Sequence, residues 1–166
     1  MASPIYGPIE TSPKTTEYPM NASDVFAHAG ATFVILGSDG FITPALSGTT
    51  TIFGWAIVPK GTGAGTAVND WKASSTDGKD KLAVVLASDG YTFVAPADAS
   101  VTAGQAGNAC DLVNASATDS TASVVDIGSS STDVFIIQGL ALGKVPGAAA
   151  GDVLVKVNPA KLQADT

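Results

Sequence analysis

Short apolar runs separated by turn residues dominate this chain from Ala31 onward. The runs are rich in β-branched and aromatic residues, and Gly, Ser, Asp and Pro fill the gaps between them. This alternation is typical of strands joined by turns, and no run is long enough for a membrane-spanning helix. The predicted strands cover residues 31–36, 50–58, 82–86, 91–95, 108–113, 122–127, 134–140 and 153–157.

Helix-favouring residues are scarce. The 166 residues include 18 glycines, two glutamates and no arginine, and 45% of the residues are hydrophobic against 14% charged. A chain of this size has room for one domain with a real core. We therefore predict an all-β fold, a single small β-barrel or β-sandwich over residues 23–166, preceded by an extended N-terminal arm over residues 1–22.

The run at residues 50–58 alternates with a period of two. Phe53, Trp55 and Ile57 fall on one face and apolar or small residues on the other, so a central strand with both faces covered is expected, with Trp55 in the core. An internal echo links residues 34–41 with residues 84–91, where an apolar run is followed by Ser-Asp-Gly and an aromatic residue. Asp-Gly favours tight turns, so the echo predicts two hairpins, the second a possible duplicate of the first.

Four prolines space the N-terminal arm, which forbids a helix and is expected to interrupt any sheet ladder. Between them lie Tyr6, Ile9 and Tyr18. One interpretation is a frayed terminus. The other is that these three side chains are anchors that bind a partner surface. The glycine-rich segments 59–70 and 113–123 are expected to be exposed loops.

The charge pattern argues against polyanionic ligands. The net charge is −7, arginine is absent, and no lysine lies between Lys81 and Lys144, an interval that holds six aspartates. Such a surface repels nucleic acid and anionic lipid, so we expect neither a nucleic-acid partner nor a membrane. No signal-peptide pattern is present, which indicates synthesis in the cytoplasm.

Catalytic and metal-binding patterns are weak. His28 and Cys110 are the single histidine and the single cysteine, and nothing in the local sequence pairs them as base and nucleophile. They cannot supply the three or four ligands that zinc takes, and no loop has EF-hand spacing, although aspartates in turns leave calcium as an alternative. The glycine-rich stretch at 61–66 lacks the Lys-Ser/Thr of a phosphate loop. We predict no enzyme, no cofactor and no metal site.

Trp71 has two interpretations. It stands between Asp70 and Lys72, which suits an exposed anchor for a partner or a sugar, whereas a core position is slightly favoured by its size and apolar character. We include Trp71 among the candidate partner-binding residues.

Residues 33–45 and 52–56 carry a family resemblance. The strand, Asp-Gly turn and Pro-Ala of FVILGSDGFITPA, followed by the glycine-centred strand IFGWA, resemble the capsid decoration proteins (cement or head-stabilisation proteins) of tailed bacteriophages. The resemblance implies a structural virion protein on the capsid exterior, with the major capsid protein as its partner, that forms a homo-oligomer, commonly a trimer, and sends terminal arms across neighbouring subunits.

Two other functions remain as alternatives. One is a carbohydrate-binding or receptor-binding β module of a phage fibre or surface appendage, which would use Trp71 and loop aspartates. The other is a small hydrolase, which would need His28 and Cys110, or two aspartates, to meet in a pocket.

Overall fold

Antiparallel strands make up almost all of the regular structure, as the sequence predicts. The computed structural model describes residues 6–28, 31–59, 70–114, 123–128, 130–141 and 151–164, and its helices within these ranges are three short 3₁₀ turns. These turns are η1 (Ala87–Asp89), η2 (Ala103–Gln105) and η3 (Pro159–Lys161). The all-β class is confirmed.

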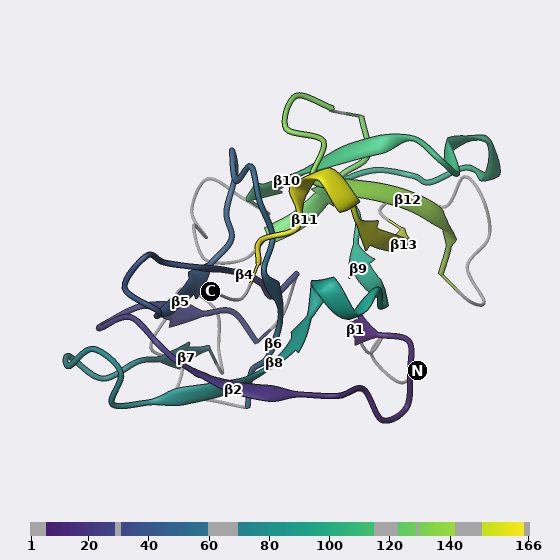
Figure 1. Cartoon of the computed structure of the whole chain (residues 1–166). Coiled ribbons are helices and arrows are strands. Elements are labelled where there is room, and N and C mark those ends of the chain that lie inside the picture. The colour runs from purple at the N-terminus through teal and green to yellow at the C-terminus, as the bar shows by residue number, and fades with distance from the viewer. Residues whose placement is uncertain are drawn as a thin grey trace.

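Two groups of five strands form the body (Figure 1). Unit 1 has the strand order β2-β8-β6-β4-β5 and unit 2 the order β9-β13-β12-β10-β11. The strands of unit 1 are β2 (Thr16–Pro19), β4 (Phe33–Leu36), β5 (Ile42–Pro44), β6 (Gly54–Ile57) and β8 (Lys81–Leu86). Those of unit 2 are β9 (Thr92–Pro96), β10 (Ala109–Asn114), β11 (Ser123–Asp126), β12 (Phe135–Leu140) and β13 (Asp152–Val157).

The two units share one topology. When the five strands of each unit are numbered along the chain, their order across the sheet is 1-5-4-2-3 in both units. In both units, a single parallel bridge also connects the residue after the first strand to the third strand. The bridges are Met20–Ile42 and Ala97–Val125. Each sheet therefore curls until its edges touch at one residue pair. The strands do not form a closed barrel, and the arrangement is that of a β-sandwich.

Short strands complete the sheets. β1 (Gly7–Pro8) pairs with β9 at the edge of unit 2, and β3 (Val25–Phe26) pairs with β7 (Trp71–Lys72) in a separate ribbon. In Figure 1, β1 lies beside β9, whereas β2 runs along the outer side of unit 1. The chain therefore reaches unit 2 before it begins unit 1.

Two apolar cores hold the units together. The smaller core fills unit 1, with Val34, Phe53 and Val84 among its buried residues, and the larger core fills unit 2 and the junction between the units. β6 serves both, because Trp55 points into the larger core and Ala56 into the smaller one. The strand is therefore covered on both faces at its centre, and Trp55 is only 4% exposed. The expectation that Phe53, Trp55 and Ile57 share one face is wrong, because Phe53 packs in the smaller core and Ile57 is 44% exposed.

An aromatic cluster marks the junction between the units. Phe33 packs edge-on against Trp55 with 4.7 Å between ring centroids, and Trp55 stacks on Phe93 at 5.8 Å. Phe135 contacts Phe33 at 4.5 Å. Because Phe33 and Trp55 belong to unit 1 and the other two rings to unit 2, burial of these rings stabilises the attachment of the units.

The two Ser-Asp-Gly segments have different outcomes. Around Asp39 the prediction is confirmed, since β4 and β5 form a hairpin whose turn places Gly40 at φ +82°. Around Asp89 the hairpin prediction is wrong. There the segment forms η1, Gly90 caps it in the left-handed region, and the chain passes from β8 in one sheet to β9 in the other. The apolar run fixes a strand in both cases, but its pairing partner is set by the packing of the units.

The N-terminal arm is extended, but its prolines do not exclude it from the sheets, so that expectation is wrong. Pro8 pairs with Phe93 and Pro19 with Lys81. Both prolines sit in edge strands, where the missing N–H points away from the neighbouring strand. Each predicted strand from 31–36 to 153–157 is present with shifted ends, while most of the predicted loops 59–70 and 113–123 lie outside the described residues.

Candidate functional site

Tyr6 ties the N-terminal segment to unit 2. Its ring packs against the larger core, and its hydroxyl group donates a hydrogen bond to Oδ1 of Asp152 at 3.1 Å. Burial, followed by the negative charge of Asp152 and this hydrogen bond, raises the pKa of Tyr6 to about 12. The Tyr6 side chain is therefore bound to its own chain, and not presented to a partner as the anchor interpretation expects.

The segment that follows β1 lies on the surface. We call residues 9–17 the outer segment, in which every residue except Pro13 is exposed. Ile9 is 48% exposed, and its main-chain N–H donates to the Thr92 carbonyl at 3.0 Å, so the backbone is held while the side chain faces solvent. A second tether joins the Lys14 N–H to the Tyr91 hydroxyl at 2.9 Å. Ile9 thus has the placement expected of a partner-binding anchor.

Tyr18 and Trp71 are placed against the smaller core. Tyr18 is 8% exposed and packs edge-on against Phe53 with ring centroids 4.8 Å apart. Trp71 is half-buried in β7, where it packs on the same core, and its Nε1 is buried without a hydrogen-bond partner among the described residues. The core interpretation therefore fits Trp71, and both Tyr18 and Trp71 are less exposed than Ile9.

His28 and Cys110 are placed in different surroundings. His28 is exposed, with Nδ1 3.1 Å from the Val58 carbonyl oxygen. Cys110 is fully buried in the larger core. Burial and then the nearby carboxylate of Asp111 raise the pKa of the Cys110 thiol to about 12, and further carboxylates add to the effect. A thiol that resists ionisation is the opposite of an activated nucleophile.

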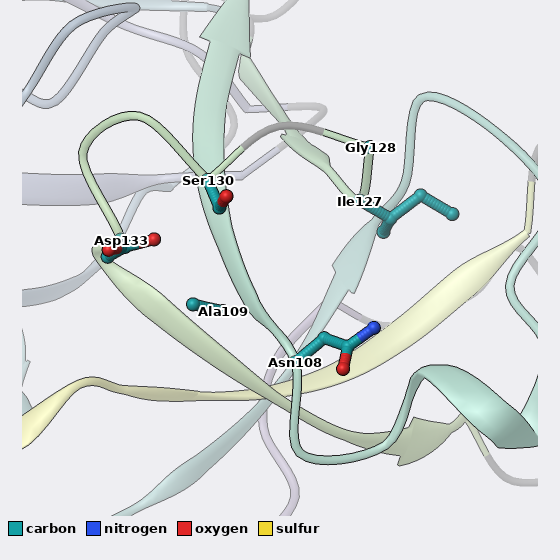
Figure 2. A pocket seen from close by; sticks show the side chains of 6 residues that line it. All are labelled: Asn108, Ala109, Ile127, Gly128, Ser130 and Asp133. Carbon is teal, nitrogen blue, oxygen red and sulfur yellow. The ribbon is translucent and has the colours of Figure 1, made fainter.

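An open pocket of about 340 Å³ lies beside β10 (Figure 2). Its lining comes from the start of β10, from the turn after β11 and from the loop into β12, and consists of Asn108, Ala109, Ile127, Gly128, Ser130 and Asp133. Asp133 adopts φ +55°, a conformation that a non-glycine residue rarely takes, and its Oδ1 is buried without a partner among the described residues.

Asp111 holds the loop behind this pocket. Its two carboxylate oxygens accept hydrogen bonds from the main-chain N–H groups of Ser131, Thr132 and Asp133 and from the Ser131 hydroxyl group, at 2.6–3.0 Å. Asp111 is 5% exposed, so these bonds compensate for burying its charge. Sequence reasoning missed this role; the signal was the Ser-Ser-Thr-Asp run, whose residues favour such turns.

The described residues bring together no group of three or more His, Cys, Asp or Glu side chains able to hold a metal ion. Within the same ranges, no helix has the length and apolar character to cross a membrane. Among the candidate residues, Ile9 on the outer segment has the exposure that contact with another protein requires. Comparison of the chain with protein-family models, with curated proteins and with solved structures found no match.

Proposed function

We propose that this protein is a structural virion protein that binds the outer surface of a tailed-phage capsid and bridges subunits of the major capsid protein. The observation that carries the proposal is the placement of the outer segment, which crosses from unit 2 to unit 1 on the surface and exposes Ile9. Both of its ends are fixed in sheets, by β1 and by β2. A surface segment that is already held in place loses little conformational entropy on binding.

The body of the molecule suits a bridging role. Two sheets share an aromatic junction, and the outer segment links β1, at the edge of unit 2, to β2, at the edge of unit 1. Strain applied to one unit is therefore transmitted to the other. A rigid body with an adhesive surface segment stabilises a shell by linking subunits that would otherwise move apart.

Co-sedimentation with capsids tests the proposal. The full-length chain is mixed with particles of the encoding phage from which this protein has been stripped, and bound protein is measured after pelleting. The unmodified chain should bind at saturable sites. Ile9→Asp should reduce affinity at least tenfold, because it places a charge where an apolar side chain contacts the shell.

The chain supplies a matched control. Ile57, at the end of β6, is 44% exposed and is the other exposed large apolar residue among the described ones. Ile57→Asp makes the same chemical change outside the outer segment and should leave capsid binding unchanged. No binding by the unmodified chain, or equal loss in both variants, would overturn the proposal. Deletion of residues 1–20 is unsuitable, since it would remove Tyr18 and Met20 from the core.

Trimer formation belongs to the same proposal. Decoration at three-fold positions of a shell requires three copies around each axis. Sedimentation equilibrium of the free protein should give either a trimer or a monomer that becomes trimeric on the shell, and the stoichiometry on particles should be a multiple of three. Another stoichiometry would contradict this arrangement.

A further inference from the structure

The main-chain pairings of the two units follow the same register, except at a bulge in β12 after Ile137. With Pro19 matched to Pro96, the edge residues Pro19 and Pro96 pair with the first residues of β8 and β13. Continuing this register around each unit reproduces further main-chain hydrogen bonds. Four bonds from an N–H to a carbonyl oxygen in unit 1 each have a counterpart in unit 2. In unit 1 they are Met20 to Asp80, Asn21 to Ile42, Ala87 to Phe53 and Gly90 to Ala87. Their counterparts in unit 2, in the same order, are Ala97 to Gly151, Asp98 to Val125, Asn158 to Val134 and Lys161 to Asn158.

The equivalence fixes which backbone groups face outward on the first strand of each unit. On β9, Ala97 bonds inward to Gly151, whereas Thr92 accepts a bond from Ile9 on the outer side. Val94 lies two residues from Thr92, so its N–H and C=O groups also point to the outer side of β9. There they face β1, with Gly7 directly opposite. On β2, Met20 bonds inward to Asp80, so the N–H and C=O groups of Glu17, the counterpart of Val94, point outward.

The described residues place no strand on the outer edge of β2, whereas β1 covers that of β9. Within the described residues, β2 is the edge strand of its sheet, and Thr15, Thr16 and Glu17 are exposed. Among the described residues, Asn21, beyond the strand, is bonded across this edge, to Ile42. An edge with outward N–H and C=O groups is a template for a further strand. The same template in unit 2 is filled by β1.

We propose that the outer edge of β2 at Thr15 and Glu17 binds an extended segment of the capsid subunit, which adds antiparallel to β2 as β1 adds to β9. The assignment of the partner rests on the function proposed above. Charge selects a partner other than a second copy of this chain. Glu17 is exposed beside this edge and the chain has a net charge of −7, so the segment that fits carries a lysine or arginine opposite Glu17.

A proline substitution tests the edge directly. Glu17→Pro removes the outward N–H of residue 17 but no bond to β8, and Pro19 already occupies an outward position of the same strand. Thr16, as a strand residue, tolerates a following proline. The variant should fold with a melting temperature near that of the parent and should bind stripped capsids at least tenfold more weakly.

Glu17→Gln is the matched control, since it keeps the backbone edge and removes only the charge. It should weaken capsid binding a few-fold, and Glu17→Lys should weaken it further, because a basic partner side chain then meets a like charge. Higher salt should reduce binding of the parent more than that of Glu17→Gln.

Amide hydrogen exchange of the unmodified chain gives a reading that needs no variant. The Thr15 and Glu17 amides should exchange rapidly in the free protein and become protected on capsids, whereas the Thr16 and Tyr18 amides, which face β8, should be protected in both states. Peptides that cover Val94, already paired with β1, should be protected in both states.

The outcomes separate this inference from the proposed function. If the unmodified chain does not bind capsids, both fail. If it binds, but Glu17→Pro binds equally well or the Thr15 and Glu17 amides gain no protection, the edge-strand inference fails and the proposed function stands.

Discussion

The hydroxyl group of Tyr6 is hydrogen-bonded to the carboxylate of Asp152, although 146 residues separate them along the chain. Asp152 is the first residue of β13, which pairs with β9, and β9 in turn pairs with β1 beside Tyr6. The bond therefore fastens the residue before β1 to the strand two positions away. It makes the N-terminal segment part of unit 2.

The first prediction concerns alkaline stability. Tyr6 titrates near pH 10 when unfolded and at about pH 12 when folded, so the folded state retains its proton longer. The stabilisation from the neutral hydroxyl is complete below pH 10 and is lost as the pH rises toward 12. Urea unfolding of Tyr6→Phe should show a smaller loss of stability across this window than the parent. Equal pH profiles for the two proteins would contradict the assigned pKa.

Gly54 is expected to be irreplaceable. A Cβ atom at this position would lie 2.5 Å from the Val85 carbonyl oxygen and 2.6 Å from Cγ1 of Val84, in a buried part of β6. Gly54→Ala should lower the free energy of unfolding by roughly 2 kcal/mol, because backbone atoms must shift. The control is Gly104→Ala in η2, where a Cβ meets nothing within 4 Å, and denaturant unfolding should show little change.

Asp111 should matter more for stability than its neighbour Asp126. Asp111→Asn keeps the shape but replaces one acceptor oxygen by an NH₂ group that faces N–H donors, so the loop at Ser131 loses partners. A loss of roughly 2–3 kcal/mol is expected from thermal or denaturant unfolding. Asp126→Asn removes a charge that accepts a bond from Gly128 in an exposed turn and should cost about 1 kcal/mol or less. A similar effect of both variants would refute the role assigned to Asp111.

The Cys110 thiol should not react with thiol reagents in the native protein. It is fully buried, and its raised pKa keeps it protonated at pH 8. A thiol reagent such as dithionitrobenzoate should therefore react at the rate at which the protein opens, and addition of denaturant should expose one thiol per chain. Immediate reaction of the folded protein would show that this part of the larger core is accessible.

The strands were predictable from sequence because their signal is local. The alternation around Trp55 and the apolar runs at residues 82–86 and 153–157 identify strands whatever their neighbours are. The N-terminal pairings were not predictable, since proline argues against a strand unless the edge position is known. The burial of Tyr18 likewise depends on Phe53, which is distant in sequence.

The equivalence of the two units also escapes a reading of the sequence. The echo between residues 34–41 and 84–91 joins segments that have different places in the fold. The structural counterpart of Val34 is instead Cys110, because Val34 pairs with Gly54 as Cys110 pairs with Phe135. The same strand pairing can form with side chains of different size and chemistry, so the two units need not share any similar stretch of sequence.

The first and last described segments each lie on the half of the molecule with which they are not continuous in sequence. β1 lies on unit 2, while Leu162 bridges to Ile52 and Gln163 bonds through its side chain to the backbone of Leu36, both in unit 1. Neither half can melt without breaking the contacts of a segment that continues into the other half, so heating should give one calorimetric peak. A partner protein fused at either terminus would pull on β1 or on the segment at Leu162 and Gln163, so surface loops are better sites for cargo display.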